Sequence, residues 1–98
     1  MRRPVIVRAE AQEDIEVAVF WYERQRQGLG ERFSQELDQL LERVGENPLQ
    51  FPEVGQAVRR GLLHRFPYAV YFRTSEVISA IIAVLHQYRH PDAWKGRI

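Results

Sequence analysis

The chain has 98 residues, a formal net charge of +1 and no cysteine. This length fits one domain over residues 1–98 with one modest core. The lack of cysteine excludes a disulfide framework, a thiolate metal site and a cysteine nucleophile. No apolar run approaches the roughly 18 residues of a membrane-spanning helix, and the first residues lack the apolar core of a signal peptide. We therefore expect a cytoplasmic protein that does not contact a membrane.

Charge is distributed unevenly along the chain. Residues 10–54 carry eleven acidic and four basic residues, whereas residues 55–98 carry seven basic and two acidic residues. All but one of the 14 basic residues are arginines, whose planar guanidinium group suits carboxylates and phosphates. The overall balance is too weakly basic, and aromatic and basic residues too little interleaved, to favour a direct nucleic-acid binder.

The first half of the chain predicts a short strand followed by two helices. Residues 5–8 (VIVR) indicate the strand, with Val5 and Val7 on one face. Helical spacing follows in two apolar series, Ala11, Ile15, Ala18, Val19 and Tyr22, then Phe33, Leu37, Leu40, Leu41 and Val44. Phe20 and Trp21 widen the first series, so we expect that helix to be buried over more than one face. The glycines of residues 25–30 separate the helices, and Gly45 and Pro48 are expected to end the second, which predicts an antiparallel helical hairpin.

The second half predicts a loop over residues 47–55, with Phe51 closing the core edge, and then three strands over residues 58–91. Phe66-Pro67 separates the first two strands, and the turn Thr74–Glu76 joins the last two. The last strand, residues 77–85, is apolar on both faces. Strict alternation places Val77, Ile81, Ala83 and Leu85 on one face, and Ile78, Ala80, Ile82 and Val84 on the other.

These elements together predict an α+β fold in two layers, of order βααβββ, with the helical hairpin packed on a mainly antiparallel sheet. The helices can cover only one face of the sheet. The apolar residues of the other face therefore predict a hydrophobic patch that a partner covers.

Several short motifs follow one another along the chain. They are AQEDI (11–15), Trp21-Tyr22, GLGERF (28–33), NPLQFP (47–52), Arg59-Arg60, RFPYAVYF (65–72) and AVLHQYRHPDAW (83–94). In this combination the chain resembles the RelE/ParE superfamily of toxins from type II toxin–antitoxin and plasmid-stabilisation modules, and is most similar to its ParE-like members. The resemblance implies the βααβββ fold, growth inhibition, a ParD/RelB-like antitoxin that wraps and neutralises the toxin, and contact with operator DNA only through that antitoxin.

The resemblance leaves two targets open. RelE-like members cleave mRNA on the ribosome with lysines, arginines and a C-terminal tyrosine, but the only lysine here is Lys95. Another ribonuclease branch uses His, Tyr, Arg and Glu, for which His86, Tyr88 and Arg65 are the candidates, with Glu53 as the only obvious acid. ParE-like members poison DNA gyrase and need no catalytic set. We therefore predict a gyrase poison, with a ribosome-dependent mRNA endoribonuclease or a non-toxic antitoxin-binding module as the alternatives.

Most candidate site residues also have a structural interpretation. His86 can cap the sheet, Tyr88 and Trp94 can be packing residues, Trp21 and Tyr22 can belong to the core, and Arg59 and Arg60 point to opposite faces of their strand. We expect no cofactor and no metal site. The candidate contacts with the antitoxin or the target are Arg59, Arg60, Arg65, Arg73, Arg89, Trp94 and Arg97.

Overall fold

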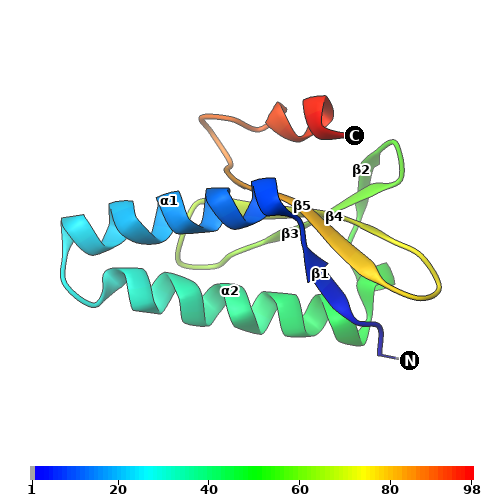
Figure 1. The fold of residues 1–98 in the computed structure, drawn as a ribbon, viewed down its shortest axis with the longest axis horizontal. Helices are drawn as coiled ribbons and strands as arrows, with labels where there is room; N and C mark the ends of the chain where they lie inside the picture. Colours follow the sequence, from blue (N-terminus) through cyan, green and yellow to red (C-terminus); the bar gives the residue numbers. More distant parts are fainter. Residues whose placement is uncertain (1) are drawn as a thin grey trace.

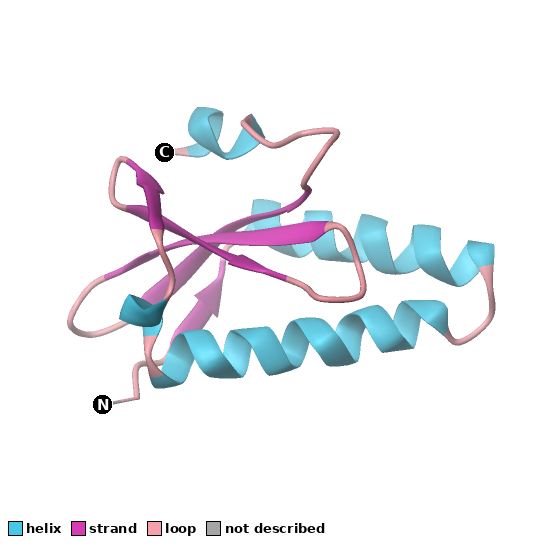
Figure 2. Ribbon diagram, turned by 180° about the vertical axis from the view of Figure 1, so that it is seen from behind, coloured by secondary structure: helices cyan, strands magenta, loops and turns pink. Residues whose placement is uncertain are grey.

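The computed structural model describes residues 2–98. Its elements are β1 (Val5–Val7), α1 (Ala9–Gln25), α2 (Leu29–Glu46), the 3-10 helix η1 (Pro48–Gln50), β2 (Glu53–Gly55), β3 (Val58–Leu62), β4 (Tyr68–Thr74), β5 (Ser79–His86) and the 3-10 helix η2 (Ala93–Arg97). One sheet has the order β1-β5-β4-β3-β2, in which only the β1–β5 pair is parallel. The helical hairpin lies on one side of this sheet and η2 on the other (Figures 1 and 2). The expected α+β fold is confirmed.

The connections differ from the prediction in two places. The loop expected over residues 47–55 contains η1 and the edge strand β2. The turn between β4 and β5 spans residues 75–78, where the backbone N–H of Ser75 donates to the carbonyl of Ile78 at 2.8 Å. Val77, expected in the last strand, lies in this turn and is 71% exposed.

Glycines and one glutamate set the geometry of the helical hairpin. The Glu23 carboxylate accepts the backbone N–H groups of Gly28 at 2.9 Å and Gly30 at 3.0 Å, which satisfies donors that the start of α2 would otherwise leave free. Gly28 has a φ of +90°, and a Cβ on Gly30 would lie 2.7 Å from the Val19 carbonyl oxygen. Both glycines are therefore required where they stand.

The main core lies between the hairpin and the sheet. Tyr22, Phe33 and Phe66 form its aromatic centre, with ring centroids 4.8–5.5 Å apart. Phe51 is 6% exposed and packs edge-on to Phe72, which confirms that it closes the core edge.

Two expectations about the helices were wrong. Phe20 and Trp21 are 64% and 44% exposed, because α1 packs on the sheet and on α2 through Ala11, Ala18 and Tyr22, which leaves its opposite side facing solvent. Gly45 does not end α2, which runs to Glu46. A Cβ on Gly45 would lie 3.2 Å from both the Arg3 carbonyl oxygen and Val5, so this glycine permits close packing with the start of the chain.

A β-bulge in β5 changes which side chains share a face. Tyr71 pairs with Ala83 and Phe72 with Ile81, so Ile82 is an extra residue on β5. Ile81 and Val84 therefore belong to the main core, whereas Ile82, Ala83 and Leu85 pack on the other face. The expected strict alternation was wrong from this residue onward.

The second face of the sheet is covered by the chain itself. Trp94 in η2 stacks on Tyr71 with ring centroids 5.7 Å apart, and the Tyr71 hydroxyl donates to the Pro91 carbonyl at 3.3 Å. Ile82 and Trp94 are only 1% and 3% exposed. The expected partner-covered patch on this face was wrong, because the C-terminal tail fills that place.

We predict that Gly30→Ala destabilises the protein, because its Cβ would meet the backbone of α1, which cannot move aside locally. Overpacking of this kind costs about 1–3 kcal/mol, which corresponds to a fall in Tm of roughly 4–20 °C for a domain of this size. Gly96→Ala is the matched control, since nothing lies within 4 Å of its added Cβ. Equal melting temperatures for the two variants would contradict the close-approach explanation.

Candidate functional site

An ion pair between α1 and the tail holds the open edge of β5. Strand β1 stops at Val7, so the N–H of Val84 and the carbonyl of Ile82 have no strand partner on that side. The Val84 N–H donates to Asp14 Oδ2 at 2.9 Å. Arg97 donates to both Asp14 carboxylate oxygens at 2.6 and 3.0 Å and to the Ile82 carbonyl at 3.1 Å. Asp14 and Arg97 therefore complete the edge of the sheet.

Arg97 is held firmly in this pair. Its side chain is 20% exposed and that of Asp14 is 14% exposed. The hydrogen bond with Asp14 raises the pKa of Arg97 above its ordinary value, against the opposing effect of partial burial. A guanidinium that makes two parallel bonds to a carboxylate and one to a carbonyl fixes geometry as well as charge, so η2 is fixed against the sheet.

A hollow of about 310 Å³, here named the His86 hollow, lies beside this pair. Its lining residues combine carboxylates, imidazoles, a guanidinium group and aromatic rings; they are Glu13, Asp14, Val17, Trp21, Tyr68, Val84, Leu85, His86, Arg89 and His90. They come from α1, from the ends of β4 and β5 and from the segment after β5.

His86 lies at the end of β5, opposite Tyr68 on β4. The backbone N–H of Tyr88 donates to His86 Nδ1 at 3.1 Å, so the neutral ring carries its proton on Nε2. Partial burial, then the neighbouring Arg89 and His90, lower the pKa of His86 below its ordinary 6.5. His86 is therefore mainly neutral at pH 7 and has one free N–H to donate.

Two tyrosines and one arginine complete this region. Burial raises the pKa of both Tyr22 and Tyr68 above 10.0, so both phenols stay protonated at neutral pH. The Arg89 guanidinium lies 5.7 Å from the centroid of the Trp21 ring, within the range of a cation–π contact.

The structure brings together only part of the predicted catalytic set. Tyr88 lies beside His86, with ring centroids 5.9 Å apart, but it is 80% exposed, so its interpretation as a packing residue was wrong. Arg65 lines a different hollow, with Arg32, Glu36 and Phe66, and its backbone N–H donates to Glu36. Glu53 lies on the far edge strand β2, paired with Arg59, away from the His86 hollow.

Most of the predicted contact residues have partners within the chain. Arg59 donates to the Phe51 carbonyl at 2.6 Å, and Arg73 donates to the Gln56 carbonyl at 2.7 and 3.1 Å. The Trp94 side chain is buried, as the packing interpretation expects, so it does not reach a partner in this conformation. Arg65 and Arg89 remain exposed. Arg60 is half-buried, and its Nε is buried without a hydrogen-bond partner among residues 2–98.

Sequence reasoning missed the two carboxylates of the His86 hollow. The local sequence gives Glu13 and Asp14 no role beyond that of acidic residues near the start of a helix. Asp14 contacts Val84 and Arg97, which lie 70 and 83 residues later in the chain. The one available signal was the position of Asp14, one residue before the core position Ile15.

Comparison with known proteins assigns the family. A family model described as the ParE toxin of the type II toxin–antitoxin system parDE matches residues 5–91. The chain belongs to this ParE toxin family. The resemblance predicted from the motifs is confirmed, and toxins of this family act with a ParD-type antitoxin. The tail residues Trp94 and Arg97 lie beyond the matched part of this ParE-family chain.

The fold is also shared with a solved structure. A chain of the chromosomal ParDE TA system from P. aeruginosa superimposes with a TM-score of 0.76 at 16% sequence identity. The match covers 87% of the present chain and 96% of the other. No curated protein matches the sequence. Within residues 2–98, no helix is both long and apolar enough to cross a membrane.

We predict that Arg97→Ala releases η2 from the sheet, because it removes three hydrogen bonds and leaves the Asp14 carboxylate without its cation. Hydrogen bonds to charged groups contribute about 1.5–3 kcal/mol. In a Trp21→Phe background Trp94 is the sole tryptophan, and its fluorescence should shift to longer wavelength. Gly96→Ala is the control, since Gly96 lies in the same 3-10 helix and nothing lies within 4 Å of its added Cβ. An unchanged spectrum for Arg97→Ala would contradict this role.

We predict that His86 titrates below pH 6.5 in the folded protein, as followed by NMR of the ring protons. A lowered folded pKa means that stability is highest above pH 6.5 and falls as the pH decreases through 6.5 toward the folded value. Arg89→Ala removes a neighbouring cation and should raise the pKa of His86. Arg65→Ala should not change it, because Arg65 lines another hollow. Equal shifts from the two variants would refute this electrostatic assignment.

Proposed function

We propose that this chain is a cytoplasmic toxin that poisons DNA gyrase and is held inactive by a ParD-type antitoxin. The proposal is carried by the position of Arg65, whose side chain lines a different hollow from that of His86. Cleavage of RNA through its 2′-OH needs a base, an acid and cations around the same phosphate. A gyrase poison acts by binding and needs no such set.

The positions of Lys95 and Glu53 support the same proposal. Lys95 lies in η2 and faces Asp92, with 3.5 Å between Nζ and Oδ1. It does not line the His86 hollow, nor does Glu53. The lysine-based and the His–Tyr–Arg–Glu ribonuclease patterns are therefore both incomplete at this hollow.

The antitoxin is proposed to bind the basic half of the chain. Arg65 and the hydrophobic Leu62, which is 46% exposed, lie near one end of β3. An acidic antitoxin segment that folds on binding would supply carboxylates to the exposed Arg65 guanidinium group. Leu62 is on the second face of the sheet, beyond the part that Trp94 covers, so the antitoxin would dock beside η2 rather than in its place.

Ribosome-dependent mRNA cleavage is the second candidate function, and one observation favours it. The His86 hollow gathers the Glu13 carboxylate, the His86 imidazole and the Arg89 guanidinium. These are groups of the kind that acid–base cleavage uses, although they differ from the predicted set. A non-toxic antitoxin-binding module is the third alternative.

Parallel assays with purified components distinguish these functions. We expect the chain to inhibit supercoiling by purified gyrase and to leave mRNA intact on purified ribosomes. Cleaved mRNA that disappears in the variant His86→Ala would instead establish the ribonuclease. Binding of the antitoxin without any effect on gyrase or ribosomes would establish the non-toxic module. Addition of the antitoxin should reverse gyrase inhibition.

A further inference from the structure

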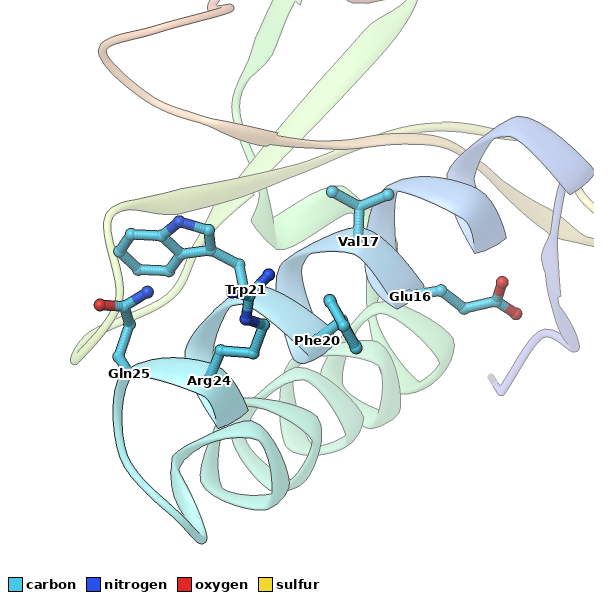
Figure 3. Close-up of a pocket in the computed structure, with 6 residues that line it drawn as sticks. All are labelled: Glu16, Val17, Phe20, Trp21, Arg24 and Gln25. Atoms are coloured by element: carbon cyan, nitrogen blue, oxygen red, sulfur yellow. The ribbon is translucent and has the colours of Figure 1, made fainter.

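The outer side of α1 carries an exposed apolar patch. Val17 is 70% exposed, Phe20 64% and Trp21 44%. Figure 3 shows these three side chains together on the helix, with Glu16 toward one end and Arg24 and Gln25 toward the other. Within residues 2–98, the Arg24 and Arg89 side chains lie over the Phe20 and Trp21 rings but leave them exposed. Large apolar side chains grouped in this way mark an interaction surface.

The residues along this side of α1 would complement those of a second α1 helix that runs in the opposite direction. Glu13, Val17, Phe20 and Arg24 are spaced i, i+4, i+7 and i+11, which places them in one stripe. The intervals 4, 3 and 4 read the same in both directions. In an antiparallel pair of α1 helices, Glu13 of one copy therefore faces Arg24 of the other, and Val17 faces Phe20.

The two charged ends of the stripe are available for such a pair. Glu13 and Arg24 are both exposed, and within residues 2–98 neither forms an ion pair. Arg24 instead lies over the Phe20 ring, 5.7 Å from its centroid. A parallel arrangement would set Glu13 against Glu13 and Arg24 against Arg24. The antiparallel arrangement sets opposite charges together and also opposes the helix dipoles.

We propose that the chain forms a twofold-symmetric homodimer through antiparallel packing of α1 on α1 of a second copy. A twofold interface requires one surface patch that complements itself. This stripe meets the requirement because its two ends carry opposite charges and its residue spacing is the same in both directions. One pair of short helices buries less than the roughly 1,200 Å² of a standard interface. The dimer is therefore weak, with a dissociation constant in the micromolar range or above, on the order of 1–100 µM.

The test is sedimentation equilibrium of the full chain over a wide concentration range. We expect monomer and dimer in concentration-dependent proportion. Phe20→Ser should weaken the dimer by more than about tenfold, because it exchanges a large apolar contact for a polar one. Leu49→Ser is the matched control, since Leu49 is also exposed, at 57%, but lies in η1.

Charge reversal tests the antiparallel geometry. Glu13→Arg or Arg24→Glu alone sets two like-charged pairs against each other in the homodimer and should weaken it by about tenfold. An equimolar mixture of these two variants should associate again, because both pairs are then of opposite charge. Circular dichroism melts establish that each variant is folded.

A chain that stays monomeric at every concentration would overturn the proposal. So would a dimer that Phe20→Ser leaves intact, or a mixture of the two charge variants that fails to associate although both are folded. If Phe20→Ser weakens only the complex with the antitoxin, the patch is an antitoxin site and the homodimer is refuted. None of these outcomes depends on which target the toxin attacks.

Discussion

The structure depends on how the edge of β5 is completed beyond the end of β1. Strand β1 has only three residues, so the bulged part of β5 has backbone groups with no strand beside them. A buried peptide group without a partner costs free energy comparable to a lost hydrogen bond. Asp14 from α1 binds the N–H of Val84, and Arg97 from η2 binds the carbonyl of Ile82. Two side chains thus replace the missing strand.

This interaction also explains the second layer of the fold. Because Arg97 is fixed to Asp14, η2 is held where Trp94 can stack on Tyr71. The bulge at Ile82 turns Ile82, Ala83 and Leu85 toward that tryptophan. The apolar face of the sheet is consequently filled by the last residues of the chain. On the hairpin, by contrast, Val17, Phe20 and Trp21 remain exposed side by side.

The sequence was sufficient for the parts of the fold that depend on local periodicity. Helical spacing placed both helices, and the β-rich stretches placed every strand except β2, because these patterns reflect contacts between near neighbours. The sequence was insufficient where a residue distant along the chain determines which side a residue faces or whether it is buried. The bulge reverses the facing of Val84, and only the pairing with β4 reveals it. The exposure of Phe20 could not be inferred, since an apolar residue beside a helical stripe looks the same whether or not another element covers it.

The same limit applies to the candidate site. His86 and Tyr88 are close in sequence and remain close in space, whereas Arg65, in the turn before β4, lines a different hollow. The residues that do join His86 come from α1, and no local motif marks that contact. Arginine side chains that looked available for a partner, such as Arg59 and Arg73, bind carbonyl oxygens of loops that they stabilise. Burial and internal bonding therefore reduce the set of arginines free to meet a target.

The measurement that tests the central claim most directly is induction of the gene alone in a bacterium, with pulse-labelling of DNA, RNA and protein synthesis over the first minutes. If the chain poisons gyrase, we expect an early fall in DNA synthesis, accompanied by an SOS response, while protein synthesis continues. An early fall in protein synthesis with cleaved mRNA would contradict that account and would assign the chemistry to the His86 hollow.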